Sequence, residues 1–95
     1  MTRRKNQDFS YFGERIKFYR RSLDLTNNSR ENFLNDRVLL GMIDENDISI
    51  KTLSNIENGY TLPNMLTLLT LSSALEVDIH DLTDDLLKDI QSNRQ

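Results

Sequence analysis

A capped polar helix followed at once by an almost wholly apolar helix is the feature that most constrains the fold of this chain. Ser49 is a favoured N-cap residue, and Gly59 stands where a residue in the left-handed conformation ends a helix. Pro63 suits the first turn of the next helix. The sequence therefore predicts a short polar helix over 49–58 and a second helix over 63–75. The second is apolar on nearly all sides, which favours a place at the centre of a bundle.

Three further apolar stripes at helical spacing predict three more helices. They span about residues 9–24, residues 29 to 41–43 and residues 79–90, and Asp78 is a plausible cap for the last. Only three glycines and one proline interrupt the chain, and the alternation typical of strands is absent. The predicted fold class is therefore all-α, a compact five-helix bundle.

The second helix has two candidate N-caps. Asn28 with Glu31 three residues later matches a capping box, and Ser29 is the alternative. Gly41 is a candidate stop for this helix. The residues 44–47 that follow, Asp-Glu-Asn-Asp, predict a polar, acidic loop before the 49–58 helix.

The length and composition of the chain limit its class. Its 95 residues are enough for one domain with a single core. It has no cysteine, which excludes a disulfide framework and a thiolate metal site. It shows neither an apolar run of membrane-spanning length nor a secretory signal, so we expect a cytoplasmic protein with no membrane partner. We expect a basic N-terminal arm over 1–8, a folded domain over 9–90 and a frayed C-terminus over 91–95.

The net charge of −3 conceals two halves of opposite sign. Residues 1–37 carry nine Lys and Arg against five Asp and Glu, whereas residues 38–95 carry three against ten. A nucleic-acid binder needs local positive potential rather than a positive total, and the N-terminal part could supply it. The alternative is that these charges are solvated helix faces.

Motifs in two separated blocks of the chain follow one order. They are Phe12-Gly13-Glu14-Arg15-Ile16-Lys17 with Arg20, Leu25-Thr26, Ser49-x-x-Thr52-Leu53-Ser54-x-Ile56-Glu57-x-Gly59, Pro63, Thr67-Leu68-Leu69, Leu71, Ala74-Leu75, Val77 and Leu82. This order resembles the Cro/cI-type helix-turn-helix family (the XRE family) of bacterial and phage repressors. The resemblance implies a lambda-repressor-like five-helix DNA-binding domain. It also implies a sequence-specific transcriptional regulator, a repressor, that acts as a homodimer on a palindromic DNA operator.

One spacing departs from the family pattern. Thr26 and Ser49 are 23 positions apart here, and the corresponding residues are much closer together in the family. The extra residues must lengthen helix two, the turn that follows it, or both. The acidic residues 44–47 then lie in or near this turn.

The resemblance places base contacts on the 49–58 helix. Lysine can reach guanine O6 and N7, asparagine can bond adenine, and isoleucine or threonine can touch a thymine methyl group. The candidate base-contacting residues are Ile50, Lys51, Thr52 and Asn55. The alternative is a merely solvated helix face.

The resemblance also suggests contacts to the DNA backbone and one structural ion pair. The candidate backbone contacts are Ser29, Arg30, Ser49 and Asn58, together with Arg3, Arg4 and Lys5 of the arm. Arg20 and Glu57 match a family salt bridge between helix one and the end of the recognition helix. A buried charge requires such a partner.

Other site types find no support in the residues. His80 is the only histidine, and the chain has no cysteine or second histidine with which it could bind a metal. Residues 44–47 lack the glycine and the distal glutamate of an EF-hand calcium loop. No catalytic triad or phosphate-binding glycine loop can be assembled. We therefore expect no enzyme activity, no cofactor, no metal and no small-molecule ligand.

A protein-interaction module with the same fold is the alternative function. The acidic turn and the acidic C-terminal part favour it, and such a module would bind a regulator or a toxin instead of DNA. The stripe of Ile79, Leu82, Leu86, Leu87 and Ile90 could close the monomer core or form a dimer seam.

Overall fold

The computed structural model describes residues 9–25 and 27–92 of the chain. These residues form five α-helices and no strand, which confirms the predicted all-α five-helix fold. The helices are α1 (Ser10–Ser22), α2 (Arg30–Leu39), α3 (Ile50–Glu57), α4 (Met65–Leu75) and α5 (Ile79–Ser92). Helix α5 therefore includes Gln91 and Ser92, which the sequence had assigned to a frayed end.

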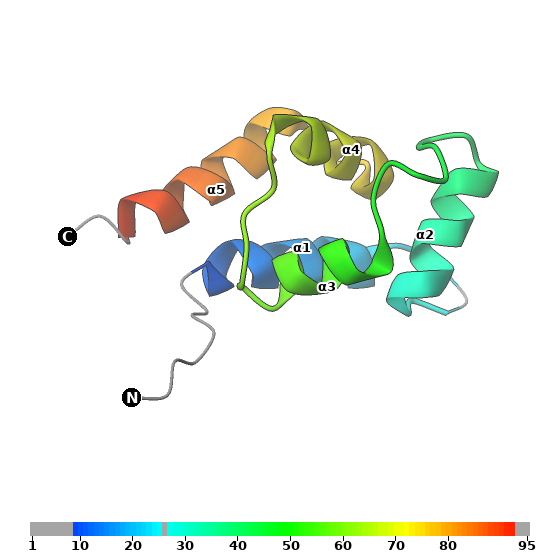
Figure 1. Cartoon of the computed structure of the whole chain (residues 1–95), viewed down its shortest axis with the longest axis horizontal. Coiled ribbons are helices and arrows are strands. Elements are labelled where there is room, and N and C mark those ends of the chain that lie inside the picture. The colour runs from blue at the N-terminus through cyan, green and yellow to red at the C-terminus, as the bar shows by residue number, and fades with distance from the viewer. Residues whose placement is uncertain (1–8, 26, 93–95) are drawn as a thin grey trace.

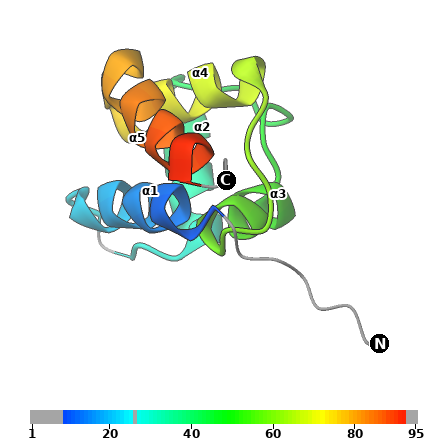
Figure 2. The same ribbon diagram turned by 90° about the vertical axis from the view of Figure 1, so that its left-hand side faces the viewer.

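The helices lie in two layers with α2 at one end (Figure 1). Helices α1 and α3 lie side by side and form one layer, and α4 and α5 form the other, as the turned view also shows (Figure 2). Helix α2 packs beside α3. The last turns of α5 return to the first turns of α1, so the described ends of the chain lie close together.

Each of the five helices contributes to one core. Its fully or nearly fully buried side chains include Phe12, Ile16, Phe33, Leu53, Ile56, Leu68, Leu71, Ala74 and Leu82. Burying a large apolar side chain stabilises the fold by about 1.5–3 kcal/mol, so these contacts are the main force that joins the layers. The predicted apolar stripes therefore face inward, and Leu82 places α5 within the monomer core.

Helix α4 differs from the prediction in its start and its surroundings. It begins at Met65, not Pro63, because the side chain of Asn64 accepts a hydrogen bond from the Thr67 amide at 2.8 Å and acts as N-cap. Its outer face is also bare: Leu66 and Leu69 have exposed fractions of 75 % and 47 %. The expectation of an all-round buried helix was wrong because a two-layer fold covers only the inner side of α4.

Helix α5 is joined to α1 by two buried carboxylates. No side chain caps α1 at Phe9, and the carboxylate of Asp89 instead accepts a hydrogen bond from the Phe12 amide. Asp85 accepts hydrogen bonds from the Tyr19 hydroxyl at 2.9 Å and from the Tyr11 hydroxyl at 3.4 Å. The sequence reading missed both aspartates, although they lie three and seven residues after Leu82 and hence on its stripe.

The N-cap of α2 is Ser29, the alternative to Asn28. The Ser29 hydroxyl accepts a hydrogen bond from the Asn32 amide at 3.1 Å, whereas the Asn28 amide group donates to the carbonyl of Leu23. The capping box on Asn28 was therefore wrong. The side chain of Asn28 is used instead to close the segment that follows α1.

Residues 40–49 connect α2 to α3, well beyond the 3–4 residues of an ordinary helix-turn-helix. Gly41 has φ +76°, in the left-handed region, and turns the chain away from α2. Ile43 and Ile48 are buried and fasten the connection to the core, while residues 44–47 are exposed. Helix α2 ends at Leu39, so the acidic residues 44–47 lie in this connection.

Candidate nucleic-acid interface

Helix α3 has one buried and one exposed side. Leu53 and Ile56 enter the core, and Lys51 and Thr52 on the opposite side are exposed. Ser49 caps the helix, since its hydroxyl accepts a hydrogen bond from the Thr52 amide at 3.0 Å. The helix therefore presents a polar face that no other described element covers.

Two glycines bring α3 close to α1. A Cβ atom on Gly13 would lie 2.5 Å from the carbonyl oxygens of Ile56 and Glu57, so only glycine fits between the two backbones. Gly59 has φ +81° and ends α3, as its sequence position predicts. Its carbonyl accepts a hydrogen bond from the Phe9 amide at 3.2 Å, which fixes the end of α3 against the start of α1.

A buried carboxylate joins three parts of the fold at the same place. Glu57 has a fully buried side chain and receives two hydrogen bonds from Arg20, at 2.7 and 2.8 Å. Arg30, at the start of α2, adds a third at 2.9 Å. Arg20 also donates to the carbonyl of Asn28. This network ties the end of α3 to α1 and α2, and the sequence had suggested only its Arg20 part.

The four candidate base contacts occupy different settings. Lys51 and Thr52 are exposed, although the Thr52 hydroxyl oxygen accepts a hydrogen bond from Ser49 at 3.0 Å. Asn55 is half-buried, one turn further along α3. Ile50 has an exposed fraction of 45 % and lines a groove between α3 and α2.

The helix-turn-helix family model matches residues 44–82 of the chain. This segment is similar to the helix-turn-helix domains of Cro/cI-type regulators. The match runs from the acidic connection through α3 and α4 to the first residues of α5. No curated protein and no solved structure matches the chain. The match supports the resemblance found in the sequence, which is to DNA-binding helix-turn-helix regulators.

The candidate backbone contacts also have roles in the fold. Ser29 and Ser49 cap α2 and α3, and both are exposed. Arg30 directs its Nε to Glu57 but keeps an exposed side-chain fraction of 29 %. The half-buried Asn58 donates to the Ser54 hydroxyl at 3.3 Å. The remaining candidates, Arg3, Arg4 and Lys5, lie outside the described residues.

The charge around α3 is mixed. Lys51 is the one cation of α3, and the single anion of this helix, Glu57, is paired with two arginines. Glu31 and the three acidic residues of 44–47 are exposed at the neighbouring surface. In residues 9–25 and 27–92 no cluster of acidic, histidine or cysteine side chains could hold a metal, and no helix there could span a membrane.

Proposed function

We propose that the protein reads a specific DNA sequence in the major groove with the α3 helix, from its cap Ser49 to Asn58. The observation that carries this proposal is the exposed polar face of a short helix whose other side is held rigidly by α1. Base readout requires such rigidity, because a base contact is made at hydrogen-bond distance. The protein would act as a transcriptional repressor in the cytoplasm, since a DNA-bound domain blocks access to the DNA that it covers.

The side chains of α3 suit distinct bases. Lys51 would donate to guanine O6 and N7, and Asn55 would make the paired contact to adenine. Thr52 and Ile50 would touch thymine methyl groups. The phosphate contacts would come from Ser29, Arg30, Ser49 and Asn58 and from Arg3, Arg4 and Lys5 of the arm.

The short length of α3 favours a homodimer on a palindromic operator. A helix of eight residues reaches only a few base pairs, and a second copy one helical turn away doubles the contacts. The bare face of α4, formed by Met65, Leu66 and Leu69, supports a seam between copies because all three side chains are apolar and exposed. The apolar stripe of α5 is a weaker candidate for the seam, since its Leu82 is buried in the monomer core.

Selection of random DNA duplexes by the purified protein tests the proposal. The selection is run at two salt concentrations with the wild type, Lys51→Ala and Lys88→Ala. Lys88 is an exposed lysine on α5 and serves as the matched control. We expect a palindromic motif from the wild type and the control, with a blurred base preference in Lys51→Ala.

Each contrary outcome has a definite meaning. An unchanged motif in Lys51→Ala would refute α3 as the reading helix. Retention without sequence preference, lost at the higher salt, would reduce the function to phosphate binding. No retention at all would favour the second candidate, a protein-interaction module, for which the acidic surface beside α3 is the specific support.

The dimer seam has its own test. Leu66→Glu places a charge on the bare α4 face without altering the core, because this side chain is 75 % exposed. Sedimentation equilibrium should show a dimer for the wild type and a monomer for this variant. An unaltered dimer would move the seam to another surface.

A further inference from the structure

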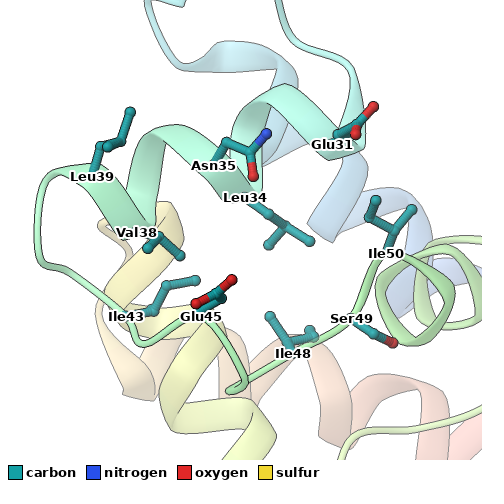
Figure 3. A pocket seen from close by; sticks show the side chains of 10 residues that line it. All are labelled: Glu31, Leu34, Asn35, Val38, Leu39, Ile43, Glu45, Ile48, Ser49 and Ile50. Carbon is teal, nitrogen blue, oxygen red and sulfur yellow. The ribbon is translucent and has the colours of Figure 1, made fainter.

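An apolar groove of about 460 Å³ lies between α2, the 40–49 connection and the start of α3 (Figure 3). Val38 from α2 and Ile43 and Ile48 from the connection line it, and Leu34 lies between them and α3. The groove exists because the long connection holds α2 and the start of α3 apart. Its volume falls within the range of ligand sites in proteins, which are mostly apolar with a few polar groups.

The edges of the groove carry apolar side chains that the protein itself leaves uncovered. Leu39 has an exposed fraction of 86 % and Ile50 one of 45 %, and both line the groove. Figure 3 shows them at opposite ends of it. An occupant that covers both must extend beyond the groove itself, so a chain segment of a partner fits better than a small molecule.

The charge beside the groove is strongly negative. Glu31 and Glu45 lie at its rim, and residues 31–50 contain five acidic side chains against one basic one. That basic residue, Arg37, is buried and is paired with Asp36 at 2.5 Å and with Glu76 at 2.8 Å. The acidic rim therefore remains unneutralised, and the complementary partner carries positive charge.

We propose that this groove binds a protein partner through an apolar chain segment that carries lysine or arginine side chains. The apolar residues of the segment occupy the space lined by Val38, Ile43 and Ile48, and its cations lie against Glu31 and Glu45. DNA does not fit this site, because phosphates would meet carboxylates and an apolar floor.

The position of the groove couples the partner to DNA. Its lining includes Ser49, the cap of α3, and Ile50, a candidate base contact. A segment bound there covers the start of the recognition helix, so partner and operator compete. This competition rests on the proposed DNA function, whereas the binding of the segment does not.

The test uses a defined probe, a fluorescein-labelled peptide with leucines at helical spacing and lysines elsewhere. Binding is followed by fluorescence anisotropy and located by the methyl NMR signals of Val38, Ile43 and Ile48. A second peptide with glutamate in place of lysine is the matched ligand control. We expect the lysine peptide to shift these methyl signals and the glutamate peptide to leave them unchanged.

Three variants separate the contributions of charge and apolar contact. Glu45→Lys should weaken the lysine peptide about fivefold at low salt, because an attraction becomes a repulsion. Leu39→Ala should weaken it about tenfold through lost apolar burial. Phe18→Ala, which removes an exposed apolar side chain on α1 outside the groove, should have no effect. Both altered groove side chains are exposed, so all three variants should fold, and circular dichroism checks this.

Several outcomes would overturn the proposal. Equal binding of the two peptides, or shifts confined to residues outside the groove, would show that no such site exists. Concentration-dependent shifts of the groove methyl signals without peptide would assign the groove to a second copy. Binding of a lipophilic cation there, unaffected by Leu39→Ala, would assign it to a small molecule. Because these readouts contain no DNA, they stand apart from the operator selection, and a final competition between peptide and selected operator tests the coupling.

Discussion

Replacing Gly13 by alanine tests whether α1 sets the position of α3, the proposed recognition helix. The new Cβ atom would lie 2.5 Å from the carbonyl oxygens of Ile56 and Glu57, whereas ordinary contact begins at 3.4 Å. Both oxygens belong to the backbone of α3, so no side-chain rotation relieves the clash. The end of α3 must therefore move away from α1 by about 0.9 Å, in a close-packed interior that resists such shifts.

The change in the free energy of unfolding of Gly13→Ala is the difference between two opposed effects. Alanine favours an α-helix over glycine by about 1 kcal/mol, which would stabilise α1. Overpacking costs about 1–3 kcal/mol in ordinary cores. Here a rigid shift of about 0.9 Å would also stretch the 2.7 Å contact between Arg20 and Glu57 past the limit of about 3.2 Å for a good hydrogen bond. Loosening this buried pair adds to the cost, so we expect Gly13→Ala to lose about 2 kcal/mol.

Thermal unfolding and DNA binding provide the assay. A loss of about 2 kcal/mol lowers the Tm of a domain of this size by roughly 10 °C, and the displaced helix should bind the selected operator more weakly. Gly41→Ala is the control: Gly41 has φ +76° with no atom within 4 Å of an added Cβ. It should lose about 1 kcal/mol through backbone strain alone and keep its operator affinity. If Gly13→Ala unfolds at the wild-type Tm, the close approach of α1 and α3 is refuted. If the variant is less stable but binds the operator with wild-type affinity, the close approach does not set the position of α3.

Three further predictions concern the caps and the tyrosine beside Asp85. Asp89→Ala should cost about 1–3 kcal/mol in urea unfolding, because the Phe12 amide loses its acceptor; a stability equal to wild type would show that another group caps α1. Ser49→Ala should cost about 1 kcal/mol by the same measurement, and no loss would mean that the cap is dispensable. Burial raises the pKa of Tyr19, and the nearby Asp85 carboxylate raises it further while Arg15 opposes. The neutral phenol is therefore favoured in the fold. The contribution of this phenol to the free energy of unfolding should be complete below about pH 10 and lost as the pH rises above that value. Unfolding curves across this range should show a steeper fall for wild type than for Tyr19→Phe, and parallel curves would contradict the shift.

Predictions from the sequence were reliable where one short segment contains all the residues that determine where a helix begins or ends. Ser49 caps α3 and Gly59 ends it because a hydroxyl beside a free amide and a missing Cβ act within a few residues. Asn28 and Pro63 failed as predicted starts for a related reason. Each had a competing neighbour, Ser29 and Asn64, and the sequence offered no means of ranking two adequate caps.

The arrangement of the candidate site was only partly accessible from the sequence. The family resemblance suggested the contact of Arg20 with Glu57, but the additional bond from Arg30 depends on where α2 lies. The groove beside α3 was not predicted at all. The acidic residues 44–47 marked an unusual connection, yet its apolar lining comes from α2, the connection and α3 together.

The sequence by itself determined the helices, their approximate ends and the apolar side of the amphipathic ones, because hydrogen bonds and side-chain periodicity within one helix fix these features. Only the tertiary structure decided which surfaces remain open. The cap of α1 comes from Asp89, 77 residues away from Phe12, and no local pattern relates the two. Helix α4 is apolar on nearly all sides, yet its outer face stays exposed because the fold supplies neighbours on one side only. Burial is a property of the packed helices together, and a chain specifies it only once those helices meet.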